Sequence, residues 1–414
     1  MRSLISLMMI LSFVTSWAQN DRIEKNNTVF FIPEFQIGKT MEANDGFPKT
    51  NLQTAAIVSL GLHNSDDVKE WAARLNFPKT GILFAFIDFG NSDKLGQAFS
   101  IIPFAEFLLL PKVYLNVGMG ASYMNILYDE IKNPFNRAIT TNLNWSFRSF
   151  IHFSLKANKS WDWRLGAGYF HHSNGHTRLP NQGLNSVLAS LSAKINTRTE
   201  HELIDKPEYS RSSQTYISGR IGFGLNVLSE EFNSKKGVYS LAFDLGKIIN
   251  KTFKFGGGFY YRFYQHYYDY IKNEEPLVIE EYPLFLENPF VYASNFGLYG
   301  SAELLLGHVG FEFEMGLNIH KPFYSIDWRL NQGYSYTNAN GTLIKVLGEF
   351  DWYYEIKRTV SARMGLKYYL FNNNRSPKYN LYLGAHINAN FGQADFTDLS
   401  LGYVYRFDLN DKQH

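Results

Sequence analysis

Apolar and polar residues alternate with a period of two along most of the chain. In residues 161–173, WDWRLGAGYFHHS, the odd-numbered positions from Trp161 to Tyr169 are all apolar, whereas Asp162 and Arg164 occupy the other parity. A period of two indicates a β-strand whose two faces meet different surroundings. Similar alternation recurs in residues 113–123, 187–196, 217–227, 253–266 and 398–407.

The repetition predicts an all-β protein, an antiparallel transmembrane β-barrel of about 12–16 strands. A secreted, soluble β-sandwich that serves in adhesion would also alternate, so other features must separate the two folds. The chain holds 27 Tyr, 35 Phe and 32 Gly, a bias typical of outer membrane barrels with their aromatic girdles. The second face keeps charges such as Arg164, Arg220, Lys254 and Arg406, which a polar lumen accepts.

The N-terminus predicts export. Residues 1–18 have the form of a signal peptide, with Arg2 before an apolar run and Ser16-Trp17-Ala18 as a small-x-small cleavage site. No later stretch reaches the roughly 20 apolar residues that a membrane-spanning helix needs. We therefore expect localisation in the bacterial cell outer membrane.

Two halves are expected after the signal peptide, over residues 19–197 and 198–414. The charged, loop-like stretch 196–213 separates them. Residues 151–170 align without gaps to residues 350–369, and Arg164-x-Gly166 then meets Arg363-x-Gly365. Either the halves are related, or any two barrel hairpins look alike. The second half completes or extends the barrel, and the sequence leaves open whether one barrel or two is formed.

Composition and charge exclude several classes of function. The formal net charge is +2 and cysteine is absent, so nothing favours a nucleic-acid partner, a disulfide or a thiolate nucleophile. His171, His172 and His176 lie close together in sequence, but neighbouring strand residues face opposite sides and no carboxylate joins them. We predict no metal and no cofactor.

His171 and Ser173 continue the apolar face of strand 161–173. In a barrel this face meets lipid. The strand begins at a short turn, so its far end is the outer one. Thirteen residues at ~3.3 Å rise and a tilt of about 40° span roughly 33 Å, more than the ~25 Å apolar band. His171 and Ser173 then lie at the outer rim, about 6.5 Å apart along the strand, where imidazole and hydroxyl form the minimal acyl-transfer pair.

The residues around this pair resemble a known family. His171-x-Ser173-Asn174-Gly175, followed by Pro180-Asn181-x-Gly183-Leu184-Asn185, is similar to the pattern of PagL-type lipid A 3-O-deacylases, which are outer membrane barrels. The resemblance is strongest over residues 113–195. It implies an esterase that removes a 3-O acyl chain from lipid A, with lipopolysaccharide in the same membrane as its substrate and partner.

Catalytic roles follow from the resemblance. Ser173 is the expected nucleophile and His171 the expected base, while Asn174, Gly175 and Asn181 are expected to position the substrate or stabilise the oxyanion. The family's third catalytic member is an acid, whereas this chain has Asn185. A neutral amide can still orient an imidazole. Glu200 or Glu202 would be a substitute acid.

Two further interpretations stay open at this point. Arg178 and His176, in the expected outer loop, are candidates for contact with lipid A phosphates or are simply solvated. The function rivalling deacylation is that of a non-enzymatic outer membrane barrel, either a porin or a lipopolysaccharide-binding structural protein. A porin has no use for His171 and Ser173 on its outward face.

Overall fold

The computed structural model describes residues 22–25, 29–64, 69–157, 161–196, 202–205, 207–348 and 350–407. The expected signal peptide, residues 1–18, lies outside this range. Among the described residues, no helix is both long and apolar enough to cross a membrane.

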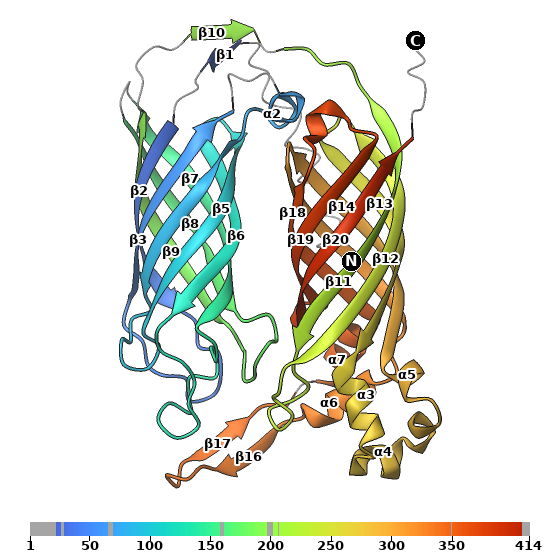
Figure 1. Cartoon of the computed structure of the whole chain (residues 1–414). Coiled ribbons are helices and arrows are strands. Elements are labelled where there is room, and N and C mark those ends of the chain that lie inside the picture. Colours follow the sequence, from blue (N-terminus) through green and yellow to red (C-terminus); the bar gives the residue numbers. More distant parts are fainter. Residues whose placement is uncertain are drawn as a thin grey trace.

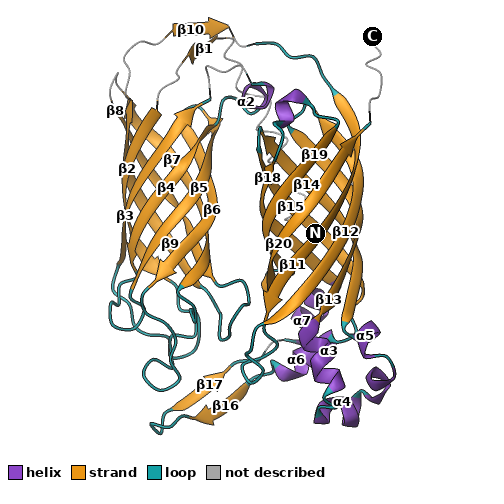
Figure 2. Cartoon of the chain, in the orientation of Figure 1, coloured by secondary structure: helices purple, strands orange, loops and turns teal. Residues whose placement is uncertain are grey.

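The chain forms two closed, antiparallel barrels of eight strands each, joined near residues 197–212 (Figures 1 and 2). The prediction of a transmembrane-type barrel is confirmed, and the sheets close as two barrels rather than one. Closure leaves no open sheet edge, so the rival β-sandwich is wrong.

The first barrel closes where β2 pairs with β9. Its strands are β2 (Val29–Thr40), β3 (Gln53–His63), β4 (Lys79–Asp88), β5 (Gln97–Leu110), β6 (Val113–Met124), β7 (Leu143–Ala157), β8 (Trp161–Ser173) and β9 (Leu184–Asn196).

The second barrel closes where β11 pairs with β20. Its strands are β11 (Ser213–Asn226), β12 (Lys236–Ile249), β13 (Phe253–Tyr264), β14 (Ser294–Leu306), β15 (Val309–His320), β18 (Val360–Tyr369), β19 (Tyr379–Asn390) and β20 (Gln393–Arg406).

The parity read from the sequence matches the two faces of the strands. In β8, Leu165 on the outer face is 49 % exposed, whereas Arg164 next to it is 1 % exposed in the lumen. The lumen also holds Arg220, Lys254 and Arg406, all buried. Apolar side chains thus form the outer wall, as lipid contact requires.

Ion pairs fill both lumens. Arg148 donates two hydrogen bonds to Glu34, at 2.6 and 2.7 Å, and Lys79 lies 2.7 Å from Glu106 in the first barrel. In the second, Lys254 Nζ lies 3.0 Å from Glu303. An eight-stranded barrel is just wide enough for its side chains to fill, so neither described lumen offers an open channel.

The long connections gather at one end of both barrels. That end carries the long loops of the first barrel, the hairpin β16 (Tyr334–Thr337) and β17 (Leu343–Val346), and five short helices (Figures 1 and 2). The helices are α3 (Gln265–Lys272), α4 (Pro276–Glu281), α5 (Pro289–Tyr292), α6 (Tyr324–Leu330) and α7 (Asp351–Thr359), with the 3₁₀ turn η2 (Pro283–Glu287) among them. By the usual asymmetry of outer membrane barrels this is the outer end.

The opposite end carries β1 (Arg22–Lys25) paired with β10 (Glu202–Asp205), together with α2 (Glu70–Arg74) and the turn η3 (Asn373–Arg375). Helix α2 lies in the long connection between β3 and β4.

The gap-free repeat alignment is wrong in detail. Residues 351–356 lie in helix α7, whereas residues 152–157, which the alignment sets against them, belong to strand β7. The following strands also differ in place, because β8 is the seventh strand of its barrel and β18 the sixth of the other. Likeness between the halves thus lies in their architecture, and two amphipathic segments of different structure produced the alignment.

Candidate active site

Strands β8 and β9 bring the predicted pair and its partner together at the outer end. In the register of these strands, His171 lies directly opposite Asn185, and across β7 and β8 Trp145 lies opposite Ser173. Asn185 is the second residue of β9, which begins directly after the loop 174–183. Two residues that are fourteen positions apart in sequence are therefore neighbours on one sheet.

These side chains form a continuous hydrogen-bonded chain. Ser173 Oγ lies 3.1 Å from His171 Nε2, and His171 Nδ1 lies 2.7 Å from Asn185 Oδ1. With Nδ1 protonated, its N–H donates to the amide oxygen and leaves Nε2 free to accept from the serine hydroxyl. This is the tautomer that a base for Ser173 requires.

Tyr169 also takes part in this hydrogen-bonded series, although the sequence pattern did not single it out. Its hydroxyl donates to Asn185 Oδ1, and its ring is stacked with that of His171, with 6.5 Å between ring centroids. The available signal was parity, because Tyr169 stands two residues before His171 on the same face of β8. A tyrosine there reads as lipid-facing until the position of Asn185 is known.

The turn after Ser173 presents backbone N–H groups. Gly175 and His176 both have positive φ, at 64° and 69°, and the N–H of Thr177 donates to Asn174 Oδ1 at 3.1 Å. The Asn174 N–H is engaged by Asn181 Oδ1 at 3.0 Å. Among the described residues, none accepts from the Gly175 N–H. The turn therefore leaves the Gly175 N–H and the Nδ2 of Asn181 as donors.

Ser173 is only 6 % exposed, and His171 is half-buried. Both side chains lie on the outward face of β8. Ser173 is therefore shielded from solvent by neighbouring side chains outside the lumen. Trp145 opposite Ser173 and the second barrel's Thr397 are in contact, with Trp145 Nε1 donating to Thr397 Oγ1 at 3.0 Å. The candidate site thus adjoins the place where the two barrels meet.

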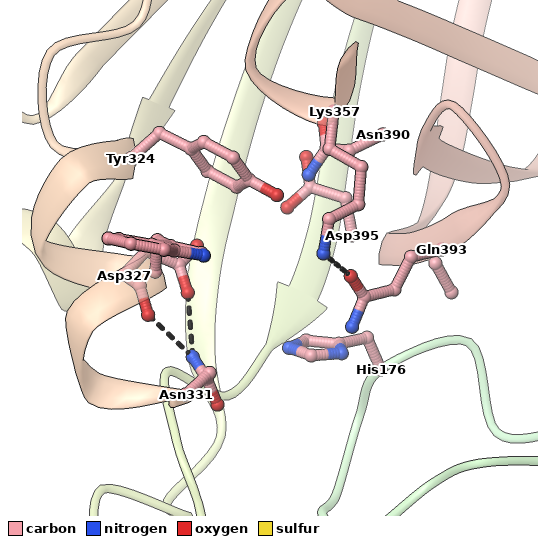
Figure 3. A pocket seen from close by; sticks show the side chains of 10 residues that line it. His176, Tyr324, Asp327, Asn331, Lys357, Asn390, Gln393 and Asp395 are labelled. Atoms are coloured by element: carbon pink, nitrogen blue, oxygen red, sulfur yellow. Dashed lines mark hydrogen bonds between the residues drawn. The ribbon is translucent and has the colours of Figure 1, made fainter. Parts of the chain in front are cut away.

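His176 and Arg178 differ in their surroundings. Arg178 is exposed, while His176 lines a polar pocket of about 30 Å³ with residues of α6, α7 and β20, among them Asp327, Lys357 and Asp395 (Figure 3). Burial lowers the pKa of His176, and burial together with Asp395 raises the pKa of Asp327 to about 6. The volume accommodates about two waters, which is far too little for a lipid headgroup.

Other candidates lie apart from the site. Glu202 is in β10, at the opposite end of the barrel (Figure 1), so it is not the missing acid, and Glu200 lies outside the described residues. In the described part of the chain no cluster of three or more His, Asp or Glu side chains forms a metal site.

Comparison with protein families gives a match within the first barrel, from before β3 into β9. Residues 48–194 match the family model described as lipid A 3-O-deacylase (PagL). This match supports a PagL-type assignment for the first barrel. This assignment and the apolar outer walls of the barrels together locate the protein in the bacterial outer membrane. The matched range ends before residue 213, so the second barrel lies outside the PagL match.

No curated protein matches the chain. Among solved structures, an outer membrane channel of Pseudomonas putida F1 is 9 % identical over 94 % of this chain and 99 % of its own, with a TM-score of 0.19. The outer membrane protein opdK of Pseudomonas aeruginosa is 8 % identical over 93 % of this chain and 100 % of its own, with a TM-score of 0.20. The architecture of this protein is therefore taken from its own strand pairing.

Proposed function

We propose that this protein is an outer membrane esterase that removes an ester-linked 3-O acyl chain from lipid A by a Ser/His mechanism. One observation carries the proposal. The chain Ser173–His171–Asn185, with contacts of 3.1 and 2.7 Å, lies on the outward face at the outer end of a PagL-type barrel. A nucleophile there meets a lipid in the outer leaflet without that lipid leaving the membrane.

In the proposed reaction Ser173 Oγ attacks the ester carbonyl carbon while His171 Nε2 takes its proton. The tetrahedral intermediate collapses as His171 returns the proton to the departing sugar oxygen. An acyl-serine and a free 3-hydroxyl result. Water then attacks the acyl-serine with His171 again as base, and the fatty acid leaves with Ser173 restored.

The oxyanion of each intermediate needs donors near Ser173 Oγ. The Gly175 N–H and Asn181 Nδ2 are the proposed donors, while the Asn174 N–H holds the Asn181 amide at 3.0 Å. Loss of one such donor costs on the order of 10²–10³ in kcat in serine esterases and proteases. Asn174 would then serve as a positioning residue.

Asn185 would orient His171 without supplying negative charge. A carboxylate would also stabilise the imidazolium that forms in the transition state. The neutral amide is the observation that favours the rival function, a lipopolysaccharide-binding barrel without catalysis. The rival porin function finds no support in lumens filled by ion pairs.

Mass spectrometry of lipid A tests the proposal. The full chain is expressed in a Gram-negative host that lacks 3-O deacylation, beside Ser173→Ala and His171→Ala. The matched control is Ser190→Ala, a lumen-facing serine of β9 whose hydroxyl has no hydrogen-bond partner among the described residues.

We expect loss of one acyl chain from lipid A with the parent and with Ser190→Ala, and intact lipid A with both site variants. Deacylation by Ser173→Ala at the parental level would exclude serine catalysis. Intact lipid A with the parent itself would favour the non-enzymatic barrel.

A further inference from the structure

The second barrel holds the loop that follows Ser173. Three residues of this loop, which covers residues 174–183, make hydrogen bonds to side chains or backbone of the second barrel. These residues are Gly175, His176 and Leu179. Their partners, Thr397, Val227 and Asn233, all lie outside residues 48–194, the range of the PagL match.

Thr397 of β20 makes the contact nearest to the nucleophile. Its hydroxyl accepts from Trp145 Nε1 at 3.0 Å and donates to the Gly175 carbonyl at 3.4 Å. A Cβ added to Gly175 would lie 2.1 Å from Thr397 Oγ1. The hydroxyl therefore bridges the cross-strand neighbour of Ser173 and the turn that carries the Gly175 N–H.

Asn233, in the connection between β11 and β12, makes a two-point contact with the same loop. Its Oδ1 accepts from the Leu179 N–H at 2.9 Å, and its Nδ2 donates to the Leu179 carbonyl at 2.6 Å. Such a pairing fixes both the position and the orientation of the Leu179 backbone. The backbone N–H of Val227 also donates to the His176 carbonyl at 3.2 Å.

Further contacts keep the barrels in place relative to each other. Arg137, in the loop between β6 and β7, forms an ion pair with Glu230. At the opposite end, Arg74 of α2 donates to the carbonyls of Tyr209 and Ser210, at 2.9 and 2.6 Å. Because the barrels are tied at both ends, the second one offers a fixed support for the loop.

We propose that the second barrel is a positioning part of the esterase, with Asn233 and Thr397 holding the loop 174–183 in its catalytic conformation. The inference rests on the proposed function. An isolated loop with a turn of two positive-φ residues loses conformational entropy when it is ordered. The contacts from the second barrel impose that order before substrate binds, so the oxyanion donors are already aligned when the intermediate forms.

This role makes a specific kinetic prediction. Loss of a positioning contact misaligns donors that act on the intermediate more strongly than on the ground-state ester, so kcat falls while KM changes little. A residue needed only for folding would instead lower the amount of folded barrel. The two effects are measured separately, by initial rates and by heat-modifiable mobility on gels.

The test uses the full-length protein in outer membrane vesicles with lipid A as substrate. The variants are Asn233→Ala, which removes the carboxamide and its two contacts, Thr397→Val, which replaces the hydroxyl by a methyl group of similar size, and Thr397→Ser, which keeps the hydroxyl. The matched control is Asn288→Ala. Asn288 caps α5 through its own side chain and contacts Val291 within the second barrel.

We expect kcat to fall on the order of tenfold in Asn233→Ala and in Thr397→Val, with KM within about twofold of the parent. Thr397→Ser should recover most of the loss, and Asn288→Ala should match the parent. If the parent is active and all variants match it, the second barrel does not position the loop. If the parent itself does not deacylate lipid A, the proposed function fails first and the positioning role falls with it.

Discussion

Tyr169 and Asn185 allow a sharp test of how the proposed esterase would orient His171 without an acid beside it. The amide of Asn185 can serve His171 only when its oxygen, not its nitrogen, faces Nδ1. The Tyr169 hydroxyl donates to that same oxygen. Because a phenolic hydroxyl is a stronger donor than acceptor, Tyr169 favours the amide orientation in which the oxygen accepts from both Tyr169 and His171.

The expected size of the effect follows from one hydrogen bond. Tyr169→Phe keeps the ring that stacks with His171 and removes only the hydroxyl, a contact worth about 0.5–1.5 kcal/mol. At ~1.36 kcal/mol per factor of ten, kcat should fall about two- to tenfold. Asn185→Ala removes both orientation and tautomer control of His171, and we expect a loss on the order of 10²-fold or more.

The decisive comparison is Tyr169→Phe in the background of Asn185→Asp. A carboxylate presents an oxygen to His171 in either orientation, so the tyrosine is no longer needed to choose one. We expect Asn185→Asp to retain or raise activity, since the charge stabilises the imidazolium. In that background Tyr169→Phe should cost less than about twofold.

Initial rates of fatty acid release, at matched amounts of folded protein, measure all four members of this cycle. Equal losses from Tyr169→Phe in both backgrounds would refute the orientation argument and assign the effect to something other than the amide. Parental activity in Asn185→Ala would show that another residue orients His171.

Three further predictions concern the proposed catalytic unit, the barrel wall and the lumen. The double variant Ser173→Ala/His171→Ala should be scarcely slower than either single variant, because the two act as one unit; a further loss in the double variant, measured by lipid A mass spectrometry, would show independent roles. Leu165→Arg should destabilise the barrel by roughly 2–4 kcal/mol in bilayer unfolding experiments, because it sets a cation against hydrocarbon near the midplane, whereas Leu165→Met should stay close to the parent. Glu34→Gln should cost about 3–5 kcal/mol in the same assay, because it leaves the Arg148 guanidinium buried without its carboxylate; a change below 1 kcal/mol would mean that water or another group replaces that partner.

The sequence predicted the barrel wall of this protein because the pattern that forms a wall lies within each strand. Each strand must present apolar residues to lipid and polar residues to the lumen, and a period of two records that requirement along the chain. Residues 161–173 were therefore assigned to one strand with the same bounds that the structure has, with His171 and Ser173 on its outward face. The family pattern added Asn185, and the register of β8 and β9 sets it opposite His171.

Periodicity could not predict how the strands close. Each strand pairs with a neighbour on both sides whatever the number of strands in the barrel. The alternation of apolar and polar residues is therefore the same in one barrel of sixteen strands and in two barrels of eight. The strand pairs β2–β9 and β11–β20, which join positions far apart in sequence, decide between them. The repeat alignment sets residues of helix α7 against residues of strand β7, because an amphipathic helix and an amphipathic strand both mix apolar and polar positions.

The sequence by itself singled out the candidate residues Ser173, His171 and Asn185, and it predicted that His171 and Ser173 lie on the outward face of the wall. Only the tertiary structure decided their surroundings. Tyr169 reaches Asn185 through space, and Thr397 meets the loop after Ser173 from 222 positions further along the chain. Such contacts have no local period or spacing in the sequence, because they depend on how strands pair and on how the two closed barrels pack against each other.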